Sequence, residues 1–280
     1  MILDILRIES LESPLLAPYR NLRERTLRGE SLFIAEGHLV VQRLLDSPFE
    51  VESVLISAEA LERLSPTLAA KLAGIPIYLI PDSEFLSKLA GFPFHQGVMA
   101  LGRRKTLPNF SEPIENCGGK PGIWVILPDA TKPDNLGLVF RSSAALGVSG
   151  VVLGERCCDP FSRRALRVSM GGVLQVPVVQ ARNLLAEIRQ IRAASGLQFY
   201  ATVLDKDAVP LDQFEERPRQ MAILFGNEYD GLAPEYVSLC HAKLTIPMAP
   251  GVDSLNLGVS VGIFLYELRR AYRHSDSGFL

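Results

Sequence analysis

The sequence contains little cysteine, no long apolar run and almost no net charge. Four cysteines occur among 280 residues, and only Cys157 and Cys158 are close in sequence, so neither a disulfide framework nor the usual spacing of zinc ligands is present. No apolar run approaches the roughly 18 residues that cross a membrane, and the N-terminal segment, which carries acidic residues early, does not have the pattern of a signal peptide. We therefore expect a protein of the reducing cytoplasm that binds neither a metal ion nor a membrane.

The charges nearly cancel, with 29 basic residues against 31 acidic residues and a net charge of −2. This balance excludes a protein that coats nucleic acid through its bulk charge, because such binding needs a large positive excess. It permits an enzyme that binds a few phosphates with a local cluster, and arginines do cluster within residues 20–28, 103–105 and 156–167. An ordinary solvated surface explains these clusters equally well.

Short apolar segments typical of strands alternate with segments of helical periodicity along the chain. Strands are expected over residues 31–35, 51–57 and 123–127, a basic helix over 14–27 and a long helix over 256–273. Hydrophobic residues make up 48% of the chain, which is enough for a substantial core. The alternation predicts an α/β fold whose sheet is mostly parallel and covered by helices.

A polar segment that is rich in proline and glycine interrupts this alternation between residues 108 and 120. Such a composition is typical of a linker between domains. The sequence therefore predicts two domains, a small α/β domain over residues 1–107 and a larger α/β domain over residues 121–280.

Three polar segments directly follow expected buried strands in the second domain. They are DATKPDNLGLVFRSS at 129–143, GNEYDGL at 226–232 and PMAPGVDSLN at 247–256. Ligands of open α/β sheets bind beyond the carboxyl ends of the strands. We therefore expect the three segments to converge on one site.

Each segment also has an ordinary structural explanation. Glu228 lies between two glycines in what could be a simple solvated turn, and Ser254 and Asn256 are residue types that cap helices well. Arg141 lies among small and apolar positions, where an arginine needs either an acidic partner or an anion. Taken singly, none of these features identifies a function.

Together, and in this order, the segments resemble the SpoU (TrmH-like) RNA 2′-O-ribose methyltransferases of the SPOUT superfamily. The first motif is matched at 134–141, the second by LFGNEYDGL at 224–232 and the third by residues 246–270. Residues 161–179 also resemble the family, and the N-terminal part looks like the small domain with which relatives bind structured RNA. The resemblance therefore covers almost the whole chain, over residues 14–273.

The chain departs from the family pattern at two places. Small packing residues differ at 257–261, and Tyr229 stands where small or polar residues are frequent, so that it would line the substrate entrance. The family fold implies a parallel sheet whose C-terminal segment passes through a loop as a trefoil knot, an exception to ordinary chain topology. The resemblance also implies a homodimer, with the helix after Asn135 and the helix over 256–273 as candidate interface elements.

The resemblance assigns roles to individual residues. The implied cofactor is S-adenosyl-L-methionine, and its expected contacts are Leu224, Gly226, Ile246, Met248 and Leu255. The expected catalytic residues are Asn135, Arg141, Glu228, Ser254 and Asn256. The expected RNA phosphate contacts are Arg23, Arg25, Arg28, Arg163, Arg164 and Arg167. Because a guanidinium stays protonated in proteins, Arg141 is expected to bind a phosphate and to stabilise a developing alkoxide rather than to act as a base.

These expectations describe an enzyme that methylates a ribose 2′-hydroxyl of structured RNA. Ribosomal RNA is favoured over transfer RNA, because an N-terminal domain of this kind often accompanies ribosomal targets in the family. One alternative is a non-catalytic RNA-binding or ribosome-assembly relative that retained the fold, and the intact set of polar residues argues against it. A dehydrogenase is a second alternative, and the lack of a GxGxxG fingerprint after a strand argues against that class.

Overall fold

The chain forms two compact units in the computed structural model, which describes residues 3–22, 27–116, 121–216, 218–252 and 254–273. Unit 1 comprises Met1–Thr106 and Phe161–Gln175, and unit 2 comprises Leu107–Pro160 and Val176–Leu280. The sequence predicts a division into residues 1–107 and 121–280. The segment Phe161–Gln175 makes its contacts within unit 1, whereas the sequence predicts it to be part of the second domain.

Unit 1 is built on a five-stranded sheet with the order β1-β4-β3-β5-β2. Strands β1, β4 and β3 pair in parallel, whereas β5 runs antiparallel to both β3 and β2. The strands are β1 (Ile5–Arg7), β2 (Leu32–Glu36), β3 (Val51–Ser57), β4 (Ile77–Ile80) and β5 (Val98–Arg103). The helices are α1 (His38–Leu45), α2 (Ala58–Glu62), α3 (Pro66–Lys71), α4 (Ser83–Ala90) and α7 (Arg163–Val168).

The described residues of the segment 14–27 do not form the predicted basic helix. Pro14–Tyr19 makes a short 3-10 helix, and the backbone is extended at Arg20 directly after it. Pro18 lies inside this helix, and a proline has no N–H group with which to continue an α-helix. The apolar side chains of the segment, such as Leu16 and Tyr19, are buried in the core although the segment forms no long helix.

A buried ion pair fastens the segment Phe161–Gln175 within unit 1. Arg163, the first residue of α7, forms an ion pair with Glu36 at the end of β2, and its Nη1 donates to the carbonyl oxygen of Leu22 at 2.6 Å. The guanidinium also lies 4.1 Å from the ring centroid of Phe92. The side chain of Glu36 is almost completely buried, so removal of the arginine would leave a buried carboxylate without its ion-pair partner.

Unit 2 contains a seven-stranded sheet with the order β10-β12-β9-β11-β6-β7-β8, and its strand pairs are parallel. The strands are β6 (Gly122–Leu127), β7 (Gly150–Leu153), β8 (Val178–Gln180), β9 (Gln198–Thr202), β10 (Val209–Pro210), β11 (Gln220–Leu224) and β12 (Ala242–Thr245). The helices are α5 (Ser111–Asn116), α6 (Pro133–Leu146), α8 (Leu184–Ala194), α9 (Pro234–Val237) and α10 (Leu257–Arg273).

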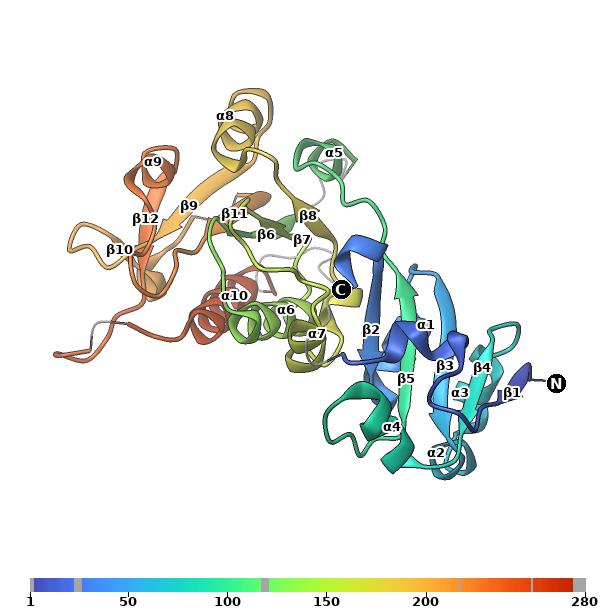
Figure 1. The fold of residues 1–280 in the computed structure, drawn as a ribbon. Helices are drawn as coiled ribbons and strands as arrows, with labels where there is room; N and C mark the ends of the chain where they lie inside the picture. Colours follow the sequence, from blue (N-terminus) through green and yellow to red (C-terminus); the bar gives the residue numbers. More distant parts are fainter. Residues whose placement is uncertain (1–2, 23–26, 117–120, 217, 253, 274–280) are drawn as a thin grey trace. The chain divides into compact units, whose positions relative to one another are not determined.

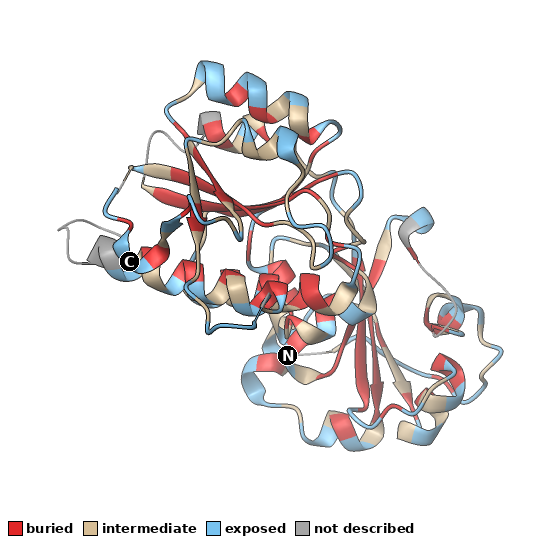
Figure 2. Cartoon of the chain, turned by 90° about the vertical axis from the view of Figure 1, so that its left-hand side faces the viewer, coloured by how far each residue is buried: buried red, intermediate tan, exposed pale blue. Residues whose placement is uncertain are grey.

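Helices cover both faces of this sheet (Figure 1). Helix α8 lies over one face, and α6 and α10 pack together on the other, with the buried strands between them (Figure 2). Ile188 of α8 belongs to the same core cluster as Trp124 of β6 and Phe199 of β9. All residues of β6 and β7 are buried, as is typical of a parallel sheet with two covered faces. The α/β architecture predicted from the sequence is confirmed.

Within the described residues, no helix is long and apolar enough to cross a membrane. The described residues also contain no group of three or more His, Cys, Asp or Glu side chains that could hold a metal ion. Burial raises the pKa of the thiols of Cys157 and Cys240 to about 12, so both stay protonated at neutral pH.

Replacing Arg163 with methionine is expected to destabilise unit 1, because the buried carboxylate of Glu36 loses its partner. The loss should be about 3 kcal/mol and should lower the thermal midpoint measured by circular dichroism. The double variant Glu36→Leu/Arg163→Met is the control, and it should recover most of the midpoint because no buried charge remains. An unchanged midpoint in Arg163→Met alone would contradict the structural role given to the ion pair.

Candidate active site

A tight loop follows β11 at the carboxyl edge of the sheet. Asn227 and Gly231 exchange two backbone hydrogen bonds of 3.2 Å. The Oδ1 of Asn227 accepts the N–H groups of Tyr229 at 2.9 Å and of Asp230 at 2.7 Å. A Cβ atom at Gly226 would lie 2.1 Å from the carbonyl carbon of Gly231, so only glycine fits there. The loop is therefore closed on itself and held in one compact conformation.

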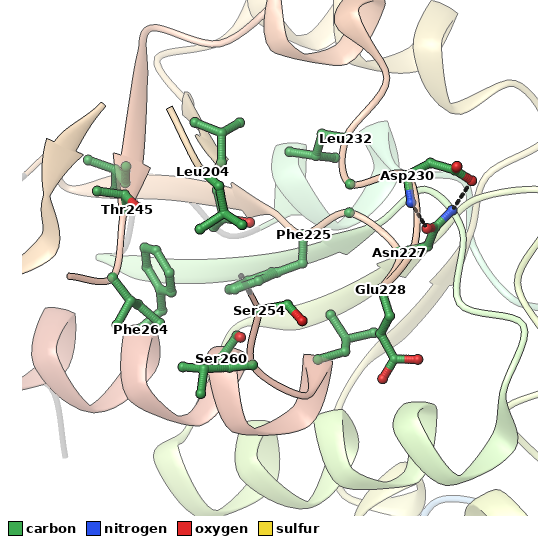
Figure 3. A pocket seen from close by; sticks show the side chains of 18 of the residues that line it. Leu204, Phe225, Asn227, Glu228, Asp230, Leu232, Thr245, Ser254, Ser260 and Phe264 are labelled. Carbon is green, nitrogen blue, oxygen red and sulfur yellow. Dashed lines mark hydrogen bonds between the residues drawn. The ribbon is translucent and has the colours of Figure 1, made fainter. Parts of the chain in front are cut away.

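This loop forms one wall of a cavity of about 500 Å³ within unit 2 (Figure 3). The chain beyond β9, the chain beyond β12 and the first turns of α10 form the other walls. Leu204 and Thr245 lie on the side of the strands, whereas Ser260 and Phe264 reach the cavity from α10 (Figure 3). Two of the three polar segments that were expected to converge, those after β11 and β12, thus meet at one cavity.

Four of the five predicted cofactor contacts line this cavity, namely Gly226, Ile246, Met248 and Leu255. The fifth, Leu224, does not line it, because its side chain is fully buried within β11. Leu224 is a core residue that ends the strand and so positions the loop after it. The cofactor contacts of the other four residues stay predictions that the geometry permits.

The cavity suits S-adenosylmethionine in both size and chemistry. Pockets that bind small organic molecules have volumes of roughly 300–1,000 Å³ and combine apolar walls with a few polar groups. Phe225, Leu244 and Phe264 offer apolar surface for a purine ring, and the hydroxyl groups of Thr245 and Ser254 offer hydrogen-bonding partners. The residues present therefore fit a nucleoside that carries an amino-acid chain.

A hydrogen-bonded network joins all three polar segments at this edge of the sheet. The Nδ2 of Asn256 donates to the Oδ1 of Asn135 at 2.9 Å and to the Oε1 of Glu228 at 3.2 Å. The Oδ1 of Asn256 accepts the N–H of Gly258 at 2.9 Å, which caps the start of α10. Asn256 is thus both a helix cap and a bridge between the other two segments.

Lys132, the residue before α6, holds the second oxygen of the Glu228 carboxylate. Its Nζ lies 2.9 Å from Glu228 Oε2 and 3.3 Å from the hydroxyl oxygen of Tyr229. The hydrogen bond from Lys132, with a further one from Asn135, lowers the pKa of Glu228 below its ordinary value. Glu228 is therefore fully ionised at neutral pH.

Two predicted catalytic residues lie outside this network. Ser254 is exposed and lines the cavity. Arg141 lies on the exposed side of α6 and does not line the cavity. Its side chain forms no hydrogen bond or ion pair with any described residue, so its guanidinium is open to an anion from solvent.

The predicted phosphate-binding arginines have different surroundings in unit 1. Arg23 and Arg25 lie outside the described residues, and so does the side chain of Arg28. Arg164 and Arg167 are exposed on α7. Arg163 is engaged in the buried ion pair described above, where the sequence predicts a phosphate contact. The geometry therefore gives Arg163 a structural role within the unit.

Several side chains of the site were not found from the sequence. Lys132 belongs to the first polar segment, but its role depends on the carboxylate of Glu228, 96 residues further along the chain. Thr202 and Leu204 line the cavity because β9 lies between β11 and β12 in the sheet. The only signal for them in the sequence is the apolar segment of β9, whose last residue is Thr202 and which Leu204 closely follows.

The parallel sheet, the cavity at its carboxyl edge and the adjacent polar network define an α/β enzyme with a site for a small organic ligand. Residues 122–266 match the SpoU rRNA Methylase family model. The chain is 31% identical to an uncharacterised tRNA/rRNA methyltransferase of Mycobacterium bovis, over 99% of this chain and 96% of that protein. The chain therefore belongs to the SpoU rRNA methylase family, and it is a methyltransferase.

Two further similarities extend this result. The 23S rRNA (guanosine(2553)-2′-O)-methyltransferase RlmP of Bacillus subtilis is 28% identical over 94% of this chain and 99% of its own length. The AdoMet-bound structure of an rRNA methyltransferase from Sinorhizobium meliloti has a TM-score of 0.80 and 29% identity, and it covers 98% of this chain and 100% of that chain. The predicted family is confirmed, and S-adenosylmethionine is confirmed as the cofactor at the level of that family.

Gly226→Ala is expected to weaken the binding of S-adenosylmethionine by about ten-fold or more, which corresponds to ~1.4 kcal/mol. The added Cβ would force the loop away from Gly231 and so move one wall of the cavity. Gly196→Ala is the matched control, because a Cβ there has nothing within 4 Å. Isothermal titration calorimetry measures both affinities, and equal values for the two variants would show that loop closure does not shape the cofactor site.

Proposed function

We propose that the protein transfers the methyl group of S-adenosylmethionine to the 2′-hydroxyl of a ribose in structured RNA, and that ribosomal RNA is its substrate class. The network in which Asn256 links Asn135 to Glu228 is the observation that supports this most directly. It fixes an ionised carboxylate beside a cavity that suits the methyl donor. The similarity to a relative named for 23S rRNA supports the choice of substrate class.

The chain's main contribution to the reaction is alignment. When bound, the cofactor supplies an activated methyl group, which the 2′-oxygen must approach in line with the bond that breaks. Lys132 and Asn256 each hold one oxygen of the Glu228 carboxylate, and the remaining lone pairs can accept a hydrogen bond from the hydroxyl group. The lowered pKa makes Glu228 a weak base, so its role is to orient the hydroxyl. The hydroxyl proton passes to solvent water as the new bond between the 2′-oxygen and the methyl carbon forms.

Arg141 binds the phosphate beside the target ribose and stabilises the negative charge that develops on the 2′-oxygen. A guanidinium stays protonated, so it cannot take up the hydroxyl proton. Its exposed position on α6 suits a group that meets the RNA backbone. Ser254, which lines the cavity, completes the group of polar residues around the acceptor.

Other parts of the proposal rest on the resemblance to the family. Unit 1 binds structured RNA, and the exposed Arg164 and Arg167 contribute phosphate contacts there. The chain beyond β12 passes through a loop of unit 2 as a trefoil knot. The enzyme works in the cytoplasm, where its RNA substrate and its cofactor are both present.

The proposal includes a homodimer formed through α6 and α10. An apolar groove of about 430 Å³ lies between these helices, and Leu138 and Ser142 form its α6 side. Val259, Ile263 and Tyr266 of α10 line the groove and are exposed, with Tyr266 at 64%. A contiguous exposed apolar surface marks an interaction site. A second copy of this chain would cover it.

Arg141→Ala is expected to reduce methyl transfer by about a thousand-fold or more, because the phosphate contact and the charge stabilisation are both lost. The affinity for S-adenosylmethionine should stay near the wild-type value, since Arg141 does not line the cavity. Label transfer from S-adenosylmethionine to total RNA of cells that lack this protein measures the first quantity, and calorimetry measures the second. Equal loss of both would contradict the division of roles, and no transfer by the wild type despite tight cofactor binding would favour the non-catalytic RNA-binding relative.

Ile263→Asp is expected to convert a dimer to a monomer, because it places an unpaired charge in the groove between α6 and α10 that the second copy would cover. Sedimentation velocity of the purified full chain measures this change directly. Leu39→Asp is the control, since Leu39 is a similarly exposed apolar side chain on α1 of unit 1. If both variants sediment like the wild type, the groove is not the interface.

A further inference from the structure

Tyr229 is the most exposed large apolar side chain in the described part of the chain, with 83% of its surface accessible. It lines the cavity and directly follows Glu228 in the sequence. Rings of this size are normally largely buried, so a ring that is left in water at the edge of a site requires a physical reason. The methyl-transfer chemistry proposed above makes no use of this ring.

The ring is presented by a rigid loop and not by a loose one. The N–H of Tyr229 donates to the Oδ1 of Asn227 at 2.9 Å, and the backbones of Asn227 and Gly231 pair across the turn. The close contact between Gly226 and Gly231 closes the base of the same loop. The loop therefore loses little conformational entropy when a ligand binds to the ring.

Lys132 links the ring to the catalytic carboxylate. Its Nζ lies 4.8 Å from the ring centroid of Tyr229 and 3.3 Å from the hydroxyl oxygen, while it also holds Glu228. A cation near an aromatic face is attracted to the ring, so Lys132 supports Tyr229 from one side. The high exposure of the ring leaves surface open for a second flat group.

We propose that Tyr229 is a stacking platform for an unpaired base of the RNA strand, supplied by the target nucleotide or its immediate neighbour. This inference rests on the proposed function. Unpaired RNA bases are commonly splayed out and stacked on aromatic side chains, and Tyr229 offers such a ring beside the cavity. Every base has a flat face, so the platform adds affinity for an opened strand without selecting one base.

The pattern of burial favours RNA over the cofactor as the ligand of this ring. Phe225 and Phe264 line the same cavity, and both are almost completely buried. We expect a purine held inside the cavity to lie on the side of these two rings. Tyr229 differs from them because its ring is accessible from solvent, the side from which a large strand must approach.

The test compares steady-state methyl transfer by the wild type, Tyr229→Ala, Tyr229→Leu and Tyr229→Phe. The methyl acceptor is ribosomal RNA purified from cells that lack this protein. Tyr229→Ala and Tyr229→Leu should each raise the KM for RNA about ten-fold, because neither side chain has a flat ring. Tyr229→Phe keeps the ring and loses only the hydroxyl contact with Lys132, so it should restore the KM. Calorimetry should show an unchanged affinity for S-adenosylmethionine in all four proteins.

Any one of four outcomes would overturn the platform. An unchanged KM for RNA in Tyr229→Ala, or a wild-type KM in Tyr229→Leu, would show that stacking is not involved. Weakened S-adenosylmethionine binding in Tyr229→Ala would assign the ring to the cofactor. Failure of the wild type to methylate any RNA would instead overturn the proposed function, and the platform with it. Emission from Trp124, the one tryptophan of the chain and a buried residue of β6, checks that unit 2 is folded in each variant.

Discussion

The site depends on one amide group, the side chain of Asn256. Its oxygen caps the first turn of α10, and its nitrogen donates at once to Asn135 and to Glu228. These partners come from segments that lie 121 and 28 residues away along the chain. Because the amide must satisfy all of these bonds together, the start of α10, the start of α6 and the loop after β11 are held in one arrangement.

That arrangement is possible because the sheet of unit 2 is parallel. The strands β6 and β11 are neighbours, so the segments that follow them leave the sheet at the same edge. The loop after β11 must then turn back within a few residues, and the close approach at Gly226 lets it do so. Gly226 closes the backbone of the loop, and Asn256 bridges the side chains of the other segments. Both therefore fix the positions of polar groups at the edge of an apolar sheet.

Much of this arrangement could be predicted from the sequence. The α/β alternation and the three polar segments were identified because strand ends in such folds carry the functional groups, and Asn135, Glu228 and Asn256 were singled out by the resemblance of those segments to the family. Lys132 and the ion pair of Arg163 could not be found, since each depends on a partner about a hundred or more residues away and a charged residue looks the same whether it is solvated or paired. The helix expected over 14–27 does not form in the described residues of that segment, because Pro18 lies inside it and has no N–H group with which to continue an α-helix.

The position of Lys132 also resolves an electrostatic difficulty. A fixed carboxylate at an RNA site repels the phosphate backbone, and the whole chain, with a net charge of −2, supplies no general attraction to compensate. Lys132 cancels the charge of Glu228 within one ion pair, and the same contact keeps the carboxylate ionised. In the proposed reaction, Arg141, which has no acidic partner among the described residues, attracts the phosphate beside the target ribose. Local pairing thus lets an acidic group act on a polyanion without a strongly basic protein around it.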